Sequence, residues 1–299
     1  MRQGIIAREP FGLPPSGKSA EGESEMGNPR RNGIKASYHY KHLSSRLSNV
    51  PYSPSQITML KSIFALTSFV ALASAHYIFP ILIVDGVETP EWQYVRRTDN
   101  SDYDKTLYGP VWGDINQPAI RCNDVARTEV TQTYNLTTSN RVGFKALTLP
   151  GQIGAYHESI TNIFLARAPT GVDVADWDGD GQVWFKIKEW TAHVNPDRTM
   201  FFESTNQTHF EFDLPQSLPS GQYLLRIENI AIHATNVVGR PLQFFLSCAQ
   251  INVANDGNGT PGPLVNVPGH YTGLEPGLDI DILNPPATYI HPGPAVWQG

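Results

Sequence analysis

Short apolar runs, separated by glycine and proline turns, constrain the fold of residues 76–299 more than any other feature of the sequence. These runs are rich in β-branched and aromatic residues or alternate apolar with polar positions, and both patterns are typical of strands. No run keeps a long helical period. The clearest candidates span residues 76–84, 142–147, 183–188, 211–214, 223–233 and 242–253. We therefore predict an all-β domain, a β-sandwich with long loops.

The sequence changes character after Asp256, where it becomes rich in Gly, Pro and Asn and loses regular patterning. A disordered linker and a coil packed along the sandwich both fit this composition. Large apolar side chains suit a packed segment, and the region contains Tyr271, Leu278, Tyr289 and Trp297. We predict an ordered C-terminal coil.

Residues 59–75 have one positive charge, an apolar run and small residues at Ala73 and Ala75, which is the pattern of a secretory signal with its cleavage site. The apolar run is about 14 residues, whereas a membrane span needs about 20. We predict cleavage after Ala75, secretion to the extracellular space and no membrane association afterwards. Residues 1–58 are too poor in apolar patterning to bury a core. They are interpreted as a gene-model artefact or a disordered leader.

The predicted mature part, residues 76–299, is acidic, with 13 Lys or Arg against 24 Asp or Glu. Binding to nucleic acid depends on Lys and Arg at phosphates, so we exclude a nucleic-acid partner. The acidic stretch 176–181 resembles the start of a calcium loop. Its twelfth position is Ile187 where that loop requires Glu, so we interpret the stretch as a turn.

Two cysteines, Cys122 and Cys248, lie in the predicted mature part. An even number of cysteines in a secreted chain indicates a disulfide, here one that closes a long loop. N-glycosylation sequons begin at Asn135, Asn206 and Asn258.

Cleavage after Ala75 would make His76 the first residue, and an N-terminal histidine has special metal chemistry. Its α-amino nitrogen and its Nδ1 can chelate one ion. The α-amino pKa is about 7.7–8.0, so a metal can displace the proton near neutral pH. A second histidine would supply a third nitrogen. Three nitrogen ligands without a thiolate suit copper(II).

Several motifs occur in the order expected of one family, beginning with His76-Tyr-Ile-Phe-Pro. The others lie at residues 90–98, 120–122, 184–187, 219–226, 230–233, 248–252, 259–265 and 292–297. Together they resemble the fungal lytic polysaccharide monooxygenases of auxiliary activity family nine, formerly glycoside hydrolase family sixty-one. The resemblance covers essentially all of residues 76–299. It implies an immunoglobulin-like or fibronectin-like β-sandwich whose flat face holds one copper ion in a histidine brace.

The same resemblance assigns the copper ligands. His76 corresponds to the first ligand and His157 to the second. The family pattern around the second ligand is His-x-Gly-Pro, whereas this chain has His157-Glu158-Ser159-Ile160. The histidine is kept although the Gly-Pro is missing.

Further site residues follow from the family's Gln-x-Tyr motif, which reads Gln243-Phe244-Phe245 here. Strand alternation places Gln243 and Phe245 on one face. Phe245 occupies the axial position but has no lone pair to donate, so it is not a ligand. The resemblance implies that Gln243 and His233 position the oxygen species, with His233 supplying a proton, and that Tyr289 contacts substrate.

Other aromatic and histidine residues are predicted to have structural roles. Core or loop anchors are Tyr77, Trp92, Trp112 and Trp184. Surface or structural histidines are His193, His209, His270 and His291.

We predict copper-dependent oxidative cleavage of a β-1,4-linked plant polysaccharide, with insoluble cellulose as the leading candidate. Hydrogen would be abstracted at C1 or C4 with hydrogen peroxide or dioxygen. An external donor, such as a small phenol or a dehydrogenase, would supply electrons to a monomeric enzyme. One alternative is a non-catalytic secreted copper-binding protein that keeps the histidine brace. Another is a hydrolase, whose activity would survive a chelator.

Overall fold

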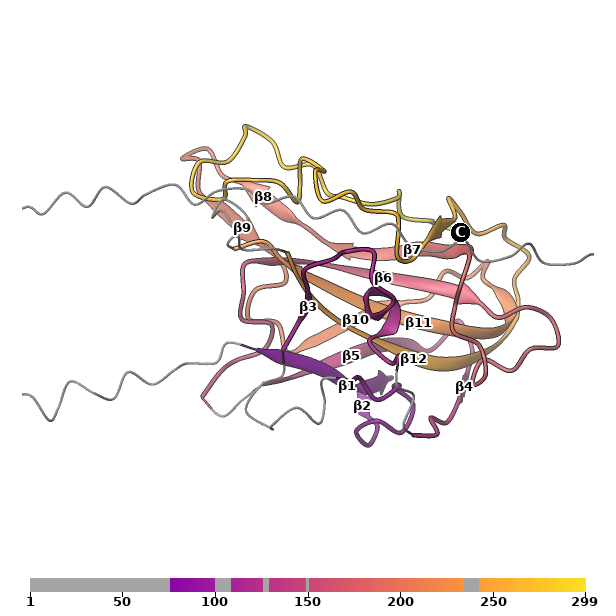
Figure 1. Ribbon diagram of the computed structural model, residues 1–299. Coiled ribbons are helices and arrows are strands. Elements are labelled where there is room, and N and C mark those ends of the chain that lie inside the picture. The colour runs from indigo at the N-terminus through magenta and orange to yellow at the C-terminus, as the bar shows by residue number, and fades with distance from the viewer. Residues whose placement is uncertain (1–75, 100–108, 126–128, 149–150, 234–241) are drawn as a thin grey trace, which may run out of the picture. The chain divides into compact units, whose positions relative to one another are not determined.

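The computed structural model describes residues 76–99, 109–125, 129–148, 151–233 and 242–299 (Figure 1). The predicted leader and signal segment lie outside the described residues. Within the described part of the chain, the one helix is the short α2 (Ala119–Cys122). No helix there is long and apolar enough to cross a membrane. The prediction of an all-β domain is confirmed.

All six predicted strands are present, with ends that shift by a few residues. They are β1 (Tyr77–Val84), β5 (Arg141–Thr148), β7 (Gln182–Trp190), β10 (His209–Asp213), β11 (Pro219–Ala231) and β12 (Gln243–Asp256). Strands that the patterns did not reveal are β2 (Val87–Glu88), β3 (Val111–Trp112), β4 (Tyr134–Leu136), β6 (Ser159–Arg167), β8 (Ala192–Val194), β9 (Met200–Phe202) and β13 (Val265–Asn266).

Two sheets form the sandwich, and a small third sheet pairs β8 with β9. The smaller main sheet has the order β10-β5-β1-β2. The larger has the order β13-β7-β6-β11-β12-β3, and β4 joins it in parallel beside β12. Long antiparallel strands with short edge strands give the immunoglobulin-like arrangement that was predicted.

The core between the sheets forms because each sheet turns one apolar face inward. From the smaller sheet come Phe79 and Leu82 of β1. From the larger come Leu225 of β11 and Ile251 of β12, in one buried cluster with them. Burying a side chain of this size contributes roughly 1.5–3 kcal/mol. This cluster is what fixes the two sheets face to face.

The outer face of the larger sheet is also buried, because the C-terminal segment lies along it (Figure 1). Tyr271 and Leu278 pack in a second apolar cluster with Leu224 and Ile230 of β11. The backbone amide of Trp297 donates to the carbonyl of Lys186 at 2.7 Å. The prediction of an ordered C-terminal coil is confirmed.

Three of the four predicted aromatic anchors are buried or partly buried. Tyr77 and Trp184 lie in the core, and the indole of Trp184 donates to the Gly179 carbonyl at 2.8 Å. Trp92 packs against the core cluster. The prediction for Trp112 is wrong, because its side chain is 62% exposed. β3 is the edge strand of its sheet, and an edge leaves a side chain open to solvent.

The acidic turn and the cysteines both tie loops to the sandwich. Arg121 forms ion pairs with Asp178 at 2.8 Å and with Asp180 at 2.6 Å, so these carboxylates neutralise an arginine. A disulfide joins Cys122 of α2 to Cys248 of β12. It is the pairing that the even cysteine count indicated.

Candidate metal centre

One end of the larger sheet brings side chains from four strands into a single row. The register pairs Ser159 with Ala231, Ala231 with Gln243, and Gln243 with Trp112, across β6, β11, β12 and β3. Directly opposed residues point to the same face of a sheet. Here that is the inner face, because Ala231 belongs to the core between the sheets.

Two predicted site histidines extend this row. His157 lies two residues before β6 begins, and His233 lies two residues after β11 ends. A backbone bond from Ile232 to Glu158, at 3.0 Å, continues the ladder between them. The imidazole rings stack with centroids 4.2 Å apart and planes 5° from parallel. Their closeness is therefore a consequence of the β6–β11 register.

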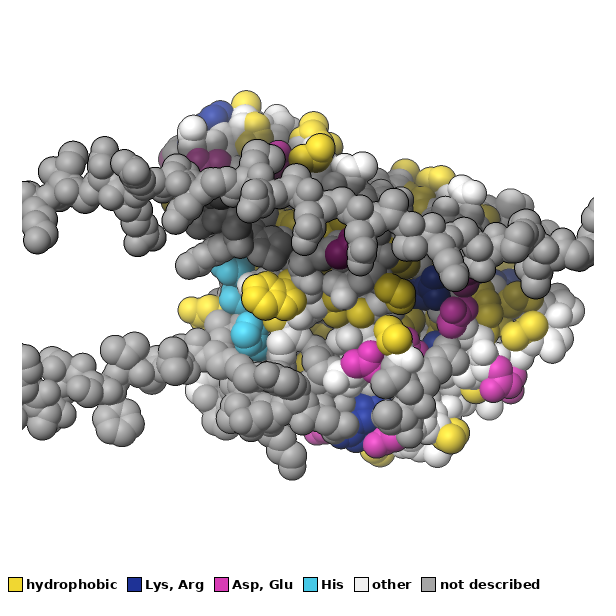
Figure 2. Space-filling model, viewed as in Figure 1, with side chains coloured by type: hydrophobic (Ala, Val, Ile, Leu, Met, Phe, Trp, Pro, Cys, Tyr) yellow, Lys and Arg dark blue, Asp and Glu magenta, His cyan; other side chains and the backbone are white. Residues whose placement is uncertain are grey.

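The third histidine comes from the opposite sheet. His76 directly precedes β1, and its ring centroid lies 6.4 Å from that of His157, with the planes at 62°. The Phe245 ring lies 6.1 Å from His76 and 5.7 Å from His157. We call His76, His157 and His233 the histidine centre. Figure 2 shows histidine side chains gathered at the surface there, with a hydrophobic side chain beside them.

A set of buried, hydrogen-bonded polar side chains holds the start of β1. The Tyr77 hydroxyl donates to Oδ1 of Asn229. Nδ2 of Asn229 donates to Ser159 at 2.9 Å and to Thr161 at 2.8 Å. All four residues are buried, and burial raises the pKa of Tyr77. Tyr77 also stacks on Phe245 at 4.0 Å, so the residue after His76 is fixed on two sides.

Sequence reasoning missed the Tyr77–Asn229 contact. The available signal was a set of polar residues, Ser159, Thr161 and Asn229, in strands that are otherwise apolar. A buried polar side chain requires a partner, so such residues predict a hydrogen-bonded group inside the sandwich.

The donors at the centre fit a nitrogen-ligated metal. Burial, and after it the charge of His233, lowers the pKa of His76, which favours the neutral imidazole that binds metals. A metal–imidazole bond is about 2 Å, so two imidazoles on one ion place their ring centres roughly 6 Å apart. The rings of His76 and His157 have that separation. The two cysteines form the disulfide and offer no thiolate.

A third nitrogen depends on processing. Among the described residues, no group of three or more His, Cys, Asp or Glu side chains is arranged to hold a metal. A histidine brace uses only two side chains, and its remaining donor is the α-amino group of the first residue. In the full chain the nitrogen of His76 is a peptide amide, and it would become an amine only if the bond to Ala75 were cut.

The comparisons with known proteins identify the family. The family model described as Auxiliary Activity family 9 (formerly GH61) matches residues 76–289. The chain belongs to Auxiliary Activity family 9. This family consists of lytic polysaccharide monooxygenases, which are copper-dependent oxidoreductases that cleave polysaccharides oxidatively with the help of a reductant. Its members are generally secreted by fungi.

Relatives match along the whole domain. AA9 family lytic polysaccharide monooxygenase H of Malbranchea cinnamomea is 43% identical, over 78% of this chain and 97% of its own length. Monooxygenase C of Emericella nidulans is 42% identical, over 79% and 98%. The solved structure of CvAA9A superposes with a TM-score of 0.61 at 25% identity, over 74% of this chain and 98% of its own.

Other predicted site residues of the AA9 domain differ in their surroundings. Oε1 of Gln243 is buried and has no hydrogen-bond partner within the described residues. Phe245 is buried beneath the histidine rings. The Tyr289 hydroxyl donates to the Gly277 carbonyl at 2.8 Å, and its ring packs against the outer cluster. These contacts hold Tyr289 within the C-terminal coil.

The remaining histidines of the AA9 domain lie in other contacts. His193 pairs with Glu203 at 2.7 Å, and His209 with Glu88 at 3.2 Å. His270 lies against Tyr271 with ring centroids 3.8 Å apart. The sequon residues are exposed in every case: Asn135, Asn206 and Asn258.

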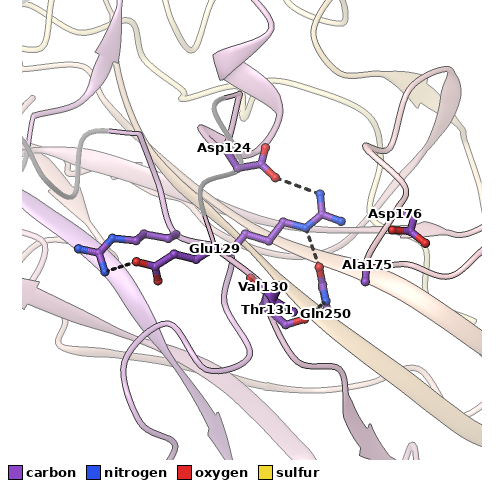
Figure 3. A pocket seen from close by; sticks show the side chains of 9 residues that line it. Asp124, Glu129, Val130, Thr131, Ala175, Asp176 and Gln250 are labelled. Atoms are coloured by element: carbon purple, nitrogen blue, oxygen red, sulfur yellow. Dashed lines mark hydrogen bonds and ion pairs between the residues drawn. The ribbon is translucent and has the colours of Figure 1, made fainter.

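A polar pocket lies farther along β12, at Gln250 (Figure 3). Arg96 donates to Gln250 at 2.9 Å and pairs with Asp124 at 3.0 Å, and another arginine pairs with Glu129. Gln250 is seven residues along β12 from Gln243, or roughly 23 Å at strand spacing. The pocket is therefore separate from the histidine centre, and each of its two arginines is paired with a carboxylate.

Proposed function

We propose that residues 76–299, released by cleavage after Ala75, bind one copper ion through His76 and His157 and oxidatively cleave a β-1,4-linked plant polysaccharide, cellulose in particular. The observation that carries the proposal is the approach of these two rings to 6.4 Å from opposite sheets. The family match begins at His76, which supports the proposed cleavage position.

Each side chain at the centre has a proposed task. His76, through its ring and its new amino group, and His157 hold the metal. Bound copper supplies the redox chemistry by which hydrogen peroxide or dioxygen leads to loss of hydrogen from C1 or C4 of a glucosyl unit. Phe245 would place an apolar ring beside the two ligand histidines. The amide of Gln243 donates a hydrogen bond, and His233, stacked on His157, holds or delivers a proton.

The proposal includes the biological setting. The protein works outside the cell, as a monomer, and receives electrons from a small phenol or a dehydrogenase. Sugar contact by Tyr289 and glycans on Asn135, Asn206 or Asn258 are parts of the same proposal. The alternative is a secreted protein that binds copper without catalysis. It is motivated by the departures from the family motifs at Glu158, Ser159 and Phe245.

The experiment uses secreted protein with a sequenced N-terminus, loaded with copper. It is incubated with phosphoric-acid-swollen cellulose, ascorbate and limiting peroxide, and products are read by mass spectrometry. We expect aldonic acids or C4-ketosugars that vanish with a chelator and in His76→Ala. Calorimetry should show that His76→Ala binds copper more weakly than wild type. Loss of a residue that only hydrogen-bonds to a ligand typically lowers metal affinity about 10–100-fold, and loss of a ligand should lower it further.

Two controls separate the roles of amine and ring. A protein that retains Ala75 keeps every side chain but turns the amine of His76 into an amide, and we expect it to lose most copper affinity. His209→Ala, in an exposed histidine bound to Glu88, should behave as wild type. Tight copper binding without oxidised sugars would favour the non-catalytic protein. Reducing-sugar release that survives the chelator would favour a hydrolase.

A further inference from the structure

The segment that carries His157 lacks a strand neighbour on one side. β6 lies between β7 and β11, but β7 ends at Trp190, which pairs with Thr161. Residues 155–158, which precede β6, belong to no helix or strand. The backbone ladder from β11 reaches Glu158 on one side only. A segment with few backbone partners opens locally at little cost, so the side once faced by β7 needs another partner to hold His157 in place.

The turn that joins β9 to β10 takes the place of β7 there. Its Asn206 amide donates to the Ala155 carbonyl at 2.7 Å, and the Ala155 amide donates to the Gln207 carbonyl at 2.7 Å. The Thr205 hydroxyl donates to the carbonyl of His157 itself at 3.0 Å. Figure 1 shows β9 at the same end of the molecule as the start of β1. The β9–β10 turn therefore supplies the missing partner.

The β9–β10 turn and the segment before β6 approach each other closely. Gly154 has a φ of +58°, and a Cβ atom there would lie 2.2 Å from the carbonyl oxygen of Gln207. Any residue with a side chain would push the two backbones apart, so this approach requires glycine. The hydroxyl of Ser204 adds a buried contact, 2.7 Å from the hydroxyl of Thr161. The turn is thus fitted against the segment on both sides of the bond from Thr205.

The same turn leads into the smaller sheet, which carries His76. The Thr208 carbonyl accepts from a backbone amide of β5 at 2.8 Å, and β10 then pairs along β5. β5 in turn pairs with β1 as far as Tyr77, the residue after His76. A hydrogen bond from this turn to His157 therefore connects the sheet that holds one proposed ligand to the segment that holds the other.

We propose that Thr205 is a positioning residue for the histidine centre, a role that rests on the copper ligands proposed above. Its hydroxyl fixes the backbone at His157 and, through the β9–β10 turn, ties that backbone to the smaller sheet. The bond thereby sets the separation of the His76 and His157 rings, which is 6.4 Å. Thr205 acts through the backbone of His157 and does not touch the metal.

Hydrogen exchange in the copper-free protein tests the contact itself. Thr205→Val keeps the shape of the side chain but removes the hydroxyl. The amides of Ala155 and Asn206 should then exchange about two- to tenfold faster, the factor that corresponds to one net hydrogen bond. Thr205→Ser should keep the rates of wild type. The matched control is Thr89→Val, because the Thr89 hydroxyl also donates to a backbone carbonyl, that of Leu82 at 2.9 Å near the other end of β1.

Copper binding to protein that begins at His76 tests the positioning role. In calorimetry, Thr205→Val should bind copper(II) about tenfold more weakly than wild type, at the lower end of the range for losing a group that orients a ligand. Its copper(II) EPR spectrum should also differ, because the ligand nitrogens are held less firmly in one geometry. Thr205→Ser should restore the affinity and the spectrum. Thr89→Val should match wild type in both, although it loses a comparable hydrogen bond.

The outcomes separate this role from the proposed function. Faster exchange in Thr205→Val with unchanged copper affinity and spectrum would make Thr205 a support of the turn alone and overturn the proposal. Unchanged exchange would overturn it too, because the hydroxyl would then not hold the segment. If wild type binds no copper, the proposed function fails, and crystals of copper-free Thr205→Val decide the positioning role. It stands if the separation of the His76 and His157 rings departs from 6.4 Å, and it falls if that separation is unchanged.

Discussion

Strands β6 and β11 carry a cluster of polar side chains, including histidine, on each face of the larger sheet. The two clusters differ in how far their side chains are exposed to solvent. On the inner face, at the end of the strands, His157 is buried beside His233 and His76, which are partly exposed. On the outer face, a set that we call the buried polar cluster lies under the C-terminal coil. Its members are Asn162, Arg226, Glu228, Tyr271 and His291.

The buried polar cluster is centred on an ion pair. Arg226 and Glu228 are each 0% exposed and 2.5 Å apart. Arg226 also donates to the carbonyls of Ile120 at 2.8 Å and Arg121 at 2.6 Å. The Tyr271 hydroxyl donates to Glu228 at 2.8 Å. Burial favours the neutral form of Glu228, but the charges of Arg226 and His270 and the hydrogen bonds from Arg226 and Tyr271 together hold the pKa of Glu228 below its ordinary value.

Asn162 extends the cluster toward the end of the coil. Its Nδ2 donates to Tyr271 at 3.2 Å, and its Oδ1 lies 2.7 Å from His291. The other ring nitrogen of His291 is 3.0 Å from the Thr191 hydroxyl. These contacts join the strands to the coil through hydrogen bonds between buried side chains. The charges and most of the polar atoms of this cluster are therefore paired inside the protein, whereas the imidazoles of His76 and His233 are partly exposed and so are accessible to a ligand.

Breaking the ion pair should give the largest loss of stability. Arg226→Met leaves Glu228 charged in the core, and removal of one partner of a buried pair costs about 3–5 kcal/mol. Urea unfolding at pH 7 measures the change. The matched control is Lys145→Met, whose exposed pair with Glu88 should contribute less than about 1 kcal/mol. Equal losses in the two variants would contradict the contrast between the clusters.

A smaller loss of stability is expected when acid protonates either of two histidines that the C-terminal coil contributes to the outer face. Burial lowers the pKa of His270 and of His291 to about 4, from an ordinary 6.5. Between those values the unfolded chain binds protons that the folded chain excludes, so stability falls as pH drops from 6.5 to 4. At about 1.4 kcal/mol per pKa unit, each histidine accounts for about 3 kcal/mol. When unfolding is measured at pH 7, 5.5 and 4, the free energy of unfolding should fall less steeply with decreasing pH in His291→Gln than in wild type. An unchanged slope would remove His291 from this account.

The smallest effect is expected at the contact that joins the histidine centre to the core. Tyr77→Phe keeps the ring on Phe245 but leaves Oδ1 of Asn229 without its donor. One lost buried hydrogen bond costs about 1–2 kcal/mol. Because the start of β1 is then held less firmly, copper affinity measured by calorimetry should also fall a few-fold. Lower stability with unchanged copper affinity would show that Tyr77 supports the fold without positioning His76.

The sequence predicted the long strands because their apolar patterns are local. It missed β6, where Ser159, Thr161 and Asn162 interrupt the apolar pattern on both faces, and the two-residue strands, which have no pattern. Proximity of His76 to His157 followed from the family resemblance alone, since it depends on pairing between distant segments. The exposure of Trp112 depends on β3 being the edge strand, which local patterns do not encode.

The disulfide between Cys122 and Cys248 has a consequence for how the enzyme is used. Members of the family consume reductant, and the same electrons could attack a crosslink. Both sulfur-bearing residues are 0% exposed. The disulfide tethers α2, and with it the turn that carries Trp112, to β12. Because its sulfur atoms are buried, a soluble electron donor does not reach them. The protein therefore separates the reducing equivalents that drive turnover from the covalent bond that keeps its surface loop in place.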